Sequence, residues 1–351
     1  MDIDVALGER SYKIHIGEGT LCRLGKSLAP FGFDKKMALI SNPTVYALYG
    51  DTVLASLKEA GYDVTVIKIP DGEEYKNLLW VEFIYGELLK ARLERGSCLV
   101  ALGGGVIGDI AGFAASTYMR GIRFVQVPTT LLAQVDSSVG GKTGVNHPLG
   151  KNMIGTFWQP SLVWIDTATL KTLPAAQFAA GMAEVIKYGV IKDRAFFEYL
   201  EKEADAIKRL EPVALRHIIA KSCGIKAEIV SLDEREGGLR AILNYGHTVG
   251  HALETITHYK RLHGECVAIG MCVEAELAEK MGLLKPGVLQ KIKALVCLYG
   301  LPAEPPEDFL VATKEQMLET MLLDKKVKGG EIRMVLPEEL GSVRIETVSG
   351  L

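Results

Sequence analysis

Two histidines stand four positions apart in the stretch NYGHTVGHALE, at His247 and His251. If this segment is helical, both imidazoles lie on one face, because residues four apart stack along a helix. Imidazole nitrogens are common metal ligands, so the pair could supply half of a metal site. The alternative is a pair of surface or buried structural histidines, and two ligands alone do not decide between these interpretations.

A third ligand could come from either of two other stretches. His263 stands in LHGECVAIG at the expected start of the next helix, where a short connection could return it towards His247. Glu184 stands in AAGMAEVIKYG, where it shares a helix face with Lys187. Two histidines, a carboxylate and open positions would suit Zn²⁺ acting as a Lewis acid. HTVGH lacks the glutamate of HExxH, which excludes that class of zinc protease.

Cationic and amide side chains occur near these candidate ligands. Lys226 precedes them, and Arg240 and Asn244 stand in DEREGGLRAILNYGH. They would reach one pocket if this segment packs on the helix that carries Glu184. The alternative interpretation is ordinary surface charge.

A glycine-rich stretch, SCLVALGGGVIGDIAGF, follows an expected strand and opens an expected helix. Gly103, Gly105 and Gly108 have the G-x-G-x-x-G spacing that lets backbone N–H groups and a helix N-terminus meet a pyrophosphate. The acidic residue expected about 20 positions later in such sites is missing, since Thr129 and Thr130 stand there. The alternative is a tight strand-to-helix turn without a ligand.

A second polar stretch, VPTTLLAQVDSSVGGKTGVNHPLGKN, reads as a long irregular loop between two strands. Long loops in compact domains are usually functional or disordered. Lys142, Lys151 and Asn152 on this glycine-flanked backbone suit an anion such as a phosphate or carboxylate. The alternative is a solvated basic loop.

The elements that must position these residues fall into two groups. Up to residue 166, short apolar runs alternate with amphipathic segments, which predicts a Rossmann-like parallel sheet covered by helices, preceded by an antiparallel hairpin over residues 4–19. Beyond it, helical periodicity dominates, with a small hairpin expected near residues 329–348. We therefore expect an α/β domain over residues 1–170 and a mainly α-helical domain over residues 171–351.

Composition excludes several classes of protein. A net charge of −3 gives no basic field for binding nucleic acid or an anionic membrane. No apolar run approaches the roughly 18 residues of a membrane span, and the opening MDIDVALGER has no apolar core of a signal peptide. The six cysteines form no CxxC pair, so we expect reduced thiols and a cytoplasmic protein.

Taken together, these stretches resemble the 3-dehydroquinate synthases, which belong to the sugar-phosphate cyclases. The resemblance covers nearly the whole chain, and its long blocks occur in the family's order. These blocks are PDGEEYKNL, ALGGGVIGDIAGFAASTYMRG, VPTTLLAQVDSSVGGKTGVN, PLGKNMIGTFWQP, FAAGMAEVIKYG, DEREGGLRAILNYGHTVGHALE, HGECVAIGM and LLDKK.

The resemblance implies an enzyme that binds NAD⁺ in the α/β domain and Zn²⁺ or Co²⁺ in the helical domain. The implied metal ligands are Glu184, His247 and His263, whereas His251 faces the substrate. That substrate is 3-deoxy-D-arabino-heptulosonate 7-phosphate, a seven-carbon keto acid phosphate. It is transiently oxidised, loses phosphate by β-elimination, is reduced again and closes to a carbocycle by an aldol step, so NAD⁺ is not consumed.

The resemblance also assigns roles to the polar residues. Lys142, Lys226, Arg240 and Asn244 match contacts to the substrate carboxylate and ring, and Asp136 and Lys187 match groups near the reacting hydroxyls. Asn152, His251 and Lys325, or Lys326 if the register shifts, match phosphate contacts. Arg120 matches an arginine supplied by the neighbouring subunit, which predicts a homodimer. The implied cofactor contacts are Asn42, Glu73, Lys76, Gly103, Gly104, Gly105, Gly108, Asp109, Thr129, Thr130, Asp136, Lys142 and Lys151.

Glu73 and Lys76 would replace the missing acidic ribose contact, because the family takes that contact from this earlier loop. Gln177 departs from the family's usual glutamate, so no charged role is expected there. Three alternatives remain open. They are a sister cyclase that makes an inosose or valiolone, a metal-dependent polyol dehydrogenase that releases NADH, and a non-catalytic nucleotide-binding module.

Overall fold

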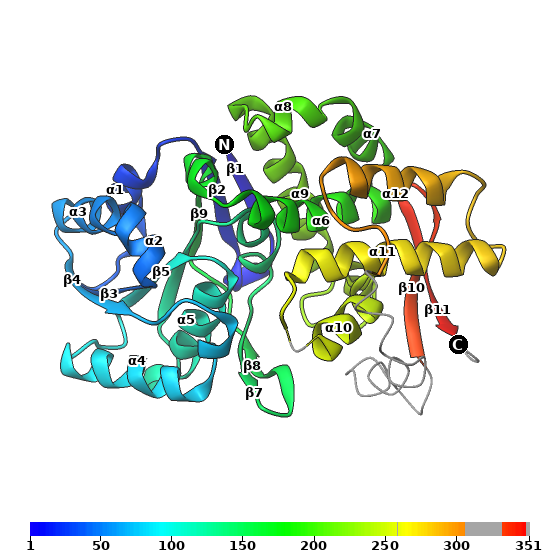
Figure 1. The fold of residues 1–351 in the computed structure, drawn as a ribbon. Helices are drawn as coiled ribbons and strands as arrows, with labels where there is room; N and C mark the ends of the chain where they lie inside the picture. Colours follow the sequence, from blue (N-terminus) through cyan, green and yellow to red (C-terminus); the bar gives the residue numbers. More distant parts are fainter. Residues whose placement is uncertain (258, 306–331, 349–351) are drawn as a thin grey trace. The chain divides into compact units, whose positions relative to one another are not determined.

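A seven-stranded sheet forms from the short apolar runs of the first half of the chain, in the order β1-β2-β9-β6-β5-β3-β4 (Figure 1). The computed structural model describes residues 1–257, 259–305 and 332–348. β1 and β2 pair antiparallel, and the remaining pairs are parallel, as the sequence predicts. The strands are β1 (Asp2–Val5), β2 (Tyr12–Gly17), β3 (Lys36–Ser41), β4 (Asp63–Lys68), β5 (Cys98–Gly103), β6 (Arg123–Pro128) and β9 (Leu162–Asp166).

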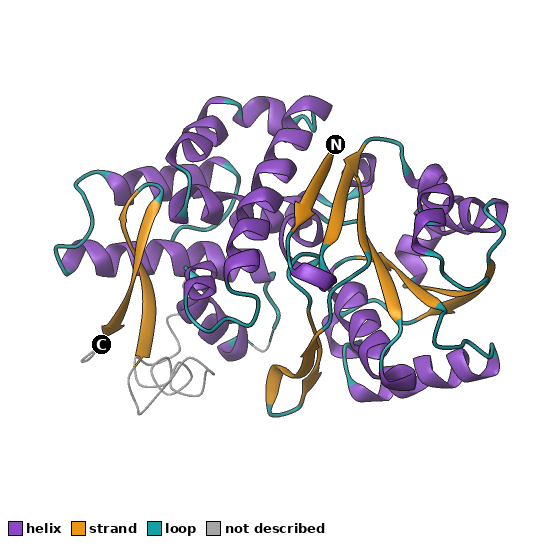
Figure 2. Ribbon diagram, turned by 180° about the vertical axis from the view of Figure 1, so that it is seen from behind, coloured by secondary structure: helices purple, strands orange, loops and turns teal. Residues whose placement is uncertain are grey.

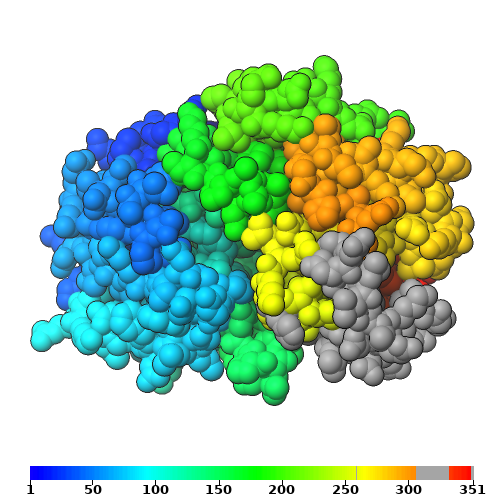
Figure 3. Space-filling model, in the orientation of Figure 1, coloured from blue at the N-terminus to red at the C-terminus, as the bar shows by residue number. Residues whose placement is uncertain are grey.

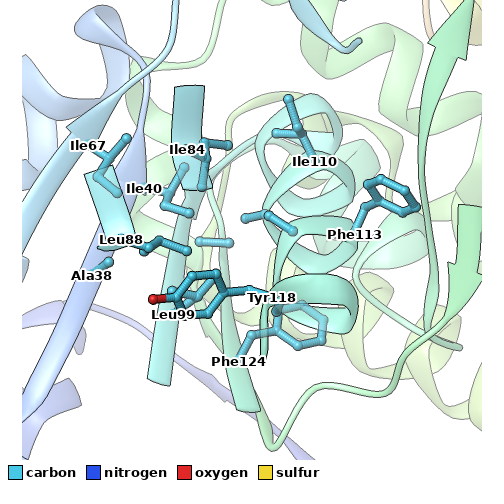
Figure 4. Packing of buried hydrophobic residues seen from close by; sticks show 14 of the residues in the cluster. Ala38, Ile40, Ile67, Ile84, Leu88, Leu99, Ile110, Phe113, Tyr118 and Phe124 are labelled. Atoms are coloured by element: carbon cyan, nitrogen blue, oxygen red, sulfur yellow. The ribbon is translucent and has the colours of Figure 1, made fainter. Parts of the chain in front are cut away.

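Helices cover both faces of this sheet because its central strands are apolar on both sides. On β3, Ala38 and Ile40 face one core and Met37 and Leu39 face the other, as the two-residue period of a strand requires. Figure 4 shows the first core, where the strands meet α4 and α5. The helices before β6 are α1 (Leu24–Ser27), α2 (Pro43–Val45), α3 (Asp51–Glu59), α4 (Leu78–Lys90) and α5 (Gly105–Thr117).

The polar stretch after β6 is more regular than the sequence predicts. It contains a short helical turn, Ala133–Ser137, and an antiparallel hairpin of β7 (Lys142–His147) and β8 (Gly150–Phe157). The expectation of an irregular loop was wrong, because backbone pairing compensates for the weak strand propensity of its glycines and asparagines. The tip lies at the surface, where Leu149 is 91% exposed, and the hairpin is the green segment at the lower edge of Figure 3.

A second group of elements is mainly helical, which confirms the predicted fold class (Figure 2). A hairpin of β10 (Ile332–Glu339) and β11 (Ser342–Val348) packs against α11 and α6. Among the described residues, no helix combines the length and apolar character that crossing a membrane requires. The helices are α6 (Ala175–Ile191), α7 (Arg194–Lys202), α8 (Ala204–Lys208), α9 (Pro212–Leu232), α10 (His247–Ile256), α11 (His263–Lys280) and α12 (Val288–Leu298).

Contacts divide the chain into two compact units. The first comprises Met1–Leu173 together with Leu215–Glu234, and the second comprises Pro174–Ala214 and Arg235–Leu351. Most of α9 therefore belongs with the sheet, although it lies in the helical half of the sequence.

Candidate active site

Three helices of the second unit bring together the side chains of a possible metal site. Glu184 lies within α6, and His247 and His263 are the first residues of α10 and α11. One potential ligand atom from each lies within 4.8 Å of the others. Glu184 Oε1 is 3.3 Å from Nε2 of His247 and 3.4 Å from Nε2 of His263. The three helices therefore direct three potential ligand atoms towards one point.

The other nitrogen of each histidine determines where the ring protons lie. Nδ1 of His247 donates to the Tyr245 carbonyl over 3.0 Å, and Nδ1 of His263 contacts the carboxylate of Glu254. Both Nε2 atoms therefore direct lone pairs towards a carboxylate oxygen of Glu184. Lone pairs that converge without a proton repel one another, so this donor set fits a cation such as Zn²⁺ or Co²⁺.

The charges of these buried groups match that assignment. Burial favours the neutral form of Glu184, but the charge of Lys187 beside it opposes this effect, and the pKa of Glu184 lies well below its ordinary value. Burial, followed by the charge of Lys187, lowers the pKa of His247 to about 4. At neutral pH the site therefore offers a carboxylate and an unprotonated imidazole, as metal binding requires.

The positions of the three donors depend on close contact between helix backbones. A methyl group at Gly264, next to His263, would overlap the backbone of Ala180 on α6. One at Gly270 would overlap the carbonyl of Gly246, which precedes His247. The fully buried Glu274 of α11 fixes the start of α10, since it accepts from the backbone N–H of Gly246 over 2.7 Å and of Val249 over 3.3 Å.

Other predicted substrate residues lie in the same unit. The ring of His251 is centred 5.3 Å from that of His247 and 6.1 Å from that of His263, although His251 is not part of the three-donor group. Arg240, 1% exposed, and Asn244 occupy the short helix Leu239–Asn244, which packs on α6. Asn244 donates to Glu236 over 2.7 Å.

In the first unit, the predicted phosphate turn joins β5 to α5. β5 ends at Gly103, and Gly104 precedes the helix without a side chain to cap it. A methyl group at Gly104 would lie 3.1 Å from the side chain of Thr130, so the glycine lets the backbone pass close to Thr130 at the helix N-terminus. Such a turn suits a pyrophosphate, since both the N–H groups and the helix dipole favour an anion.

The predicted ribose contacts lie beside this turn. The buried Nζ of Lys76 is 2.8 Å from Asp109 on α5 and 3.5 Å from Glu73. Burial raises the pKa of Asp109, although Lys76 beside it favours the charged form. Asn42 caps α2 through its side-chain oxygen, which accepts from Val45 N over 2.8 Å. The structure therefore gathers Glu73, Lys76 and Asp109, while Asn42 already has a structural role.

Lys226 of α9 belongs to this first unit. Its Nζ lies 2.7 Å from Oδ1 of Asp136 and donates to the Asp136 carbonyl over 2.8 Å. The side chain of Lys226 is nearly buried, so this charge pair is held in one geometry. On the nearby segment, Thr129 is buried and Thr130 accepts a hydrogen bond from Ala133 N over 3.2 Å.

The remaining predicted residues belong to both units, and those of the first unit lie at or near its surface. Lys142 is exposed at the start of β7, and Lys151 and Asn152 lie on β8. Arg120 lies in a strained turn, because it and Met119 both have positive φ angles, +68° and +51°. Gln177 is exposed on α6, and Lys325 and Lys326 lie outside the described residues.

Sequence reasoning missed three residues that support this site. Glu254 contacts His263, Glu274 caps α10, and Asn146 bonds to Glu73. Glu254 lies seven positions after His247, so helical periodicity could have placed it on the same face. Glu274 and Asn146 make contacts with distant segments, for which the sequence gives no comparable signal.

Comparison with known proteins identifies similar chains. Residues 66–180 match the 3-dehydroquinate synthase N-terminal family and residues 181–327 match the 3-dehydroquinate synthase C-terminal family. The chain is 56% identical to a 3-dehydroquinate synthase of Thermodesulfovibrio yellowstonii over 342 residues, covering 97% of this chain and 94% of that protein.

Two solved structures resemble it in fold. One is 2-deoxy-scyllo-inosose synthase complexed with carbaglucose-6-phosphate, NAD⁺ and Co²⁺, with a TM-score of 0.90, 27% identity and coverage of 99% and 96% of the two chains. The other is 2-epi-5-epi-valiolone synthase from Streptomyces hygroscopicus with NAD⁺ and Zn²⁺, with a TM-score of 0.89, 29% identity and coverage of 98% and 95%.

Proposed function

Because this chain belongs to the 3-dehydroquinate synthase family, we propose which of its residues carry each part of the family's reaction. The enzyme is a lyase of the shikimate pathway that converts 3-deoxy-D-arabino-heptulosonate 7-phosphate into 3-dehydroquinate and phosphate. Its cofactors are NAD⁺ and a divalent ion, Zn²⁺ or Co²⁺. The observation that carries our assignment of residues is the convergence of Glu184, His247 and His263.

We assign the ion to the second unit, where Glu184, His247 and His263 would hold it, and NAD⁺ to the first unit, at the β5–α5 turn. When bound, NAD⁺ supplies a reversible oxidation of one substrate alcohol, and the ion stabilises negative charge on the attached oxygen. Lys187 contacts Glu184 and keeps this carboxylate ionised. Glu73, Lys76 and Asp109 would hold the ribose end of the cofactor.

The other polar side chains bind a substrate that carries a carboxylate at one end and a phosphate at the other. Arg240, Asn244, Lys142 and Lys226 would hold the carboxylate and ring, so that the chain is fixed in one orientation for elimination and ring closure. Asp136, paired with Lys226, would accept hydrogen bonds from substrate hydroxyls. We assign His251 of the second unit, Asn152 of the first unit and Lys325, which lies outside the described residues, to contacts with the phosphate, where their donors would stabilise the charge that grows as phosphate leaves.

We further propose a homodimer in which Arg120 reaches the phosphate bound by the neighbouring subunit. The strained backbone at Met119 and Arg120 supports this role, because such conformations persist at sites where function requires them. We also place the enzyme in the cytoplasm. All six cysteines are free thiols, which is typical of a reducing compartment.

Phosphate release from the seven-carbon keto acid phosphate tests the function, with and without NAD⁺ and a chelator. We expect release to require both NAD⁺ and the metal, with no accumulation of NADH, because the hydride returns to the substrate. Release from carboxylate-free sugar phosphates alone would favour an inosose- or valiolone-type cyclase. Steady NADH formation from simple polyols would instead identify a dehydrogenase.

Exchange of Glu254 for glutamine tests the metal site separately from turnover. The neutral amide still accepts from Nδ1 of His263 but no longer makes this imidazole more basic. We expect zinc affinity to fall by about 10-fold to 100-fold, as for other carboxylates that orient a metal-binding histidine. Competition with a chromophoric chelator measures the affinity. An unchanged value would show that Glu254 does not act through His263.

A further inference from the structure

One asparagine of the first unit connects Glu73, which the proposed function assigns to the cofactor, with Asn152, which it assigns to the phosphate. Asn146 Nδ2 donates to Oε1 of Glu73 over 2.9 Å, in the segment of residues 73–77, which we call the cofactor loop. Asn146 Oδ1 accepts from the backbone N–H of Asn152 over 2.9 Å, in residues 147–152, which we call the hairpin tip. Its amide thus contacts a predicted ribose residue on one side and a predicted phosphate residue on the other.

The backbone presents Asn146 for this role through an irregularity in the hairpin. Val145 pairs with Ile154 and His147 with Gly150, and the register shifts between these two pairs. Asn146 leaves the ladder at this bulge, and its N–H donates to the Lys76 carbonyl over 2.7 Å. Bulges of this kind redirect side chains and are common beside active sites.

The groups that Asn146 contacts are themselves fixed. Lys76, in the cofactor loop, pairs with Asp109 over 2.8 Å and has a buried side chain. Asn152 has a φ of +54°, a left-handed conformation in which asparagine is tolerated better than most residues. Its N–H is held by Asn146, so the conformation of the hairpin tip depends on the same amide that holds Glu73.

We propose that Asn146 is a positioning residue that couples NAD⁺ binding at the cofactor loop to phosphate binding at the hairpin tip. The inference rests on the proposed function, because it takes Glu73 as a cofactor contact and Asn152 as a phosphate contact. A ligand that orders either segment orders the other through one planar amide, so each ligand raises the affinity for the other. Only a side chain with both a donor and an acceptor at this length makes both bonds.

Two substitutions distinguish the hydrogen bond to Glu73 from the hydrogen bond with Asn152. Asn146→Ala removes both bonds, whereas Asn146→Asp keeps an acceptor for Asn152 N–H but places a carboxylate against Glu73. The backbone bond from Asn146 to Lys76 does not need the side chain, so both variants keep this anchor of the hairpin. Met153→Ala, at a half-exposed apolar residue on the paired strand β8, is the matched control.

The measurements are the Kd of NAD⁺ with and without inorganic phosphate and the KM of the seven-carbon substrate at saturating NAD⁺. In Asn146→Ala we expect NAD⁺ to bind about 10-fold more weakly, as for a lost hydrogen bond to a charged group. KM should also rise, and phosphate should no longer strengthen NAD⁺ binding. In Asn146→Asp only NAD⁺ binding should weaken, and KM should stay near the wild-type value.

Opposite results are equally decisive. If Asn146→Ala binds NAD⁺ as tightly as the control and phosphate still strengthens that binding, Asn146 does not couple the binding of NAD⁺ to the binding of phosphate. If Asn146→Ala does not fold, Asn146→Asp still decides, because equal changes in NAD⁺ affinity and KM would contradict the separation predicted here. A wild-type protein that binds no NAD⁺ would overturn the proposed function itself, and this inference with it.

Discussion

Replacing His263 with alanine should remove the metal and the turnover together. Two donors would remain, Glu184 and His247, which are too few to hold a divalent ion tightly in competition with water. The ion's stabilisation of alkoxide charge contributes several kcal/mol, so we expect kcat to fall by about 10³-fold or more. Metal content after dialysis and the visible spectrum of the cobalt-loaded protein measure the loss independently of activity.

A matched control distinguishes metal binding from general damage. His217→Ala changes an exposed histidine of α9 that has no part in the donor set, so it should keep both metal and activity. Thermal unfolding of the metal-free forms then shows whether His263→Ala still folds. A His263→Ala enzyme that is fully active without bound metal would refute the assignment of these three ligands.

The second large effect is complementation between two inactive subunits. Arg120→Ala and Lys226→Ala homodimers should each lose most of their activity, since each lacks a cation for the polyanionic substrate. If Arg120 serves the partner's site, a heterodimer of the two has one intact site and one that lacks both cations. We therefore expect verified heterodimers, purified through two different tags, to recover about half of the wild-type activity.

The controls for this experiment are the unmixed homodimers carried through the same exchange. If Arg120 acts within its own subunit, both sites of the heterodimer lack one cation and no activity returns. Absence of recovery in verified heterodimers would therefore exclude a shared site. If the protein is purely monomeric in solution, the proposal that Arg120 serves the neighbouring subunit is already contradicted before any activity is measured.

The sequence predicted the sheet because strand and helix periodicities are local properties. Apolar runs such as residues 98–103 become buried strands, and glycine spacing locates the turn before α5. The β7–β8 hairpin was missed because its residues have weak strand propensity and pair only in the folded backbone. The pattern of α9 likewise does not reveal that Leu215–Glu234 groups with the sheet.

The candidate site was also predictable only where it depends on local spacing along the chain. Helical spacing places His247 and His251 on one face, and their rings do lie 5.3 Å apart. Spacing does not reveal which of them meets Glu184 and His263, because that depends on how α6, α10 and α11 pack. Family resemblance supplied the choice of His247. The supporting contacts of Glu254, Glu274 and Asn146 arise from packing and had no comparable source.

The glycine contacts between α6, α10 and α11 also bear on which ions the enzyme can use. Where a methyl group would overlap a neighbouring backbone, as at Gly264 and Gly270, the helices cannot approach further and have no side chains that could yield. These glycines consequently allow the backbones that carry the three donors to lie close together, which makes the cage of donors narrow. Zn²⁺, with bonds of about 2.0–2.2 Å to nitrogen and oxygen, suits a narrow cage, and Ca²⁺, with bonds of about 2.3–2.6 Å, needs a wider one. Selection by ionic size would therefore originate in two residues that never touch the ion.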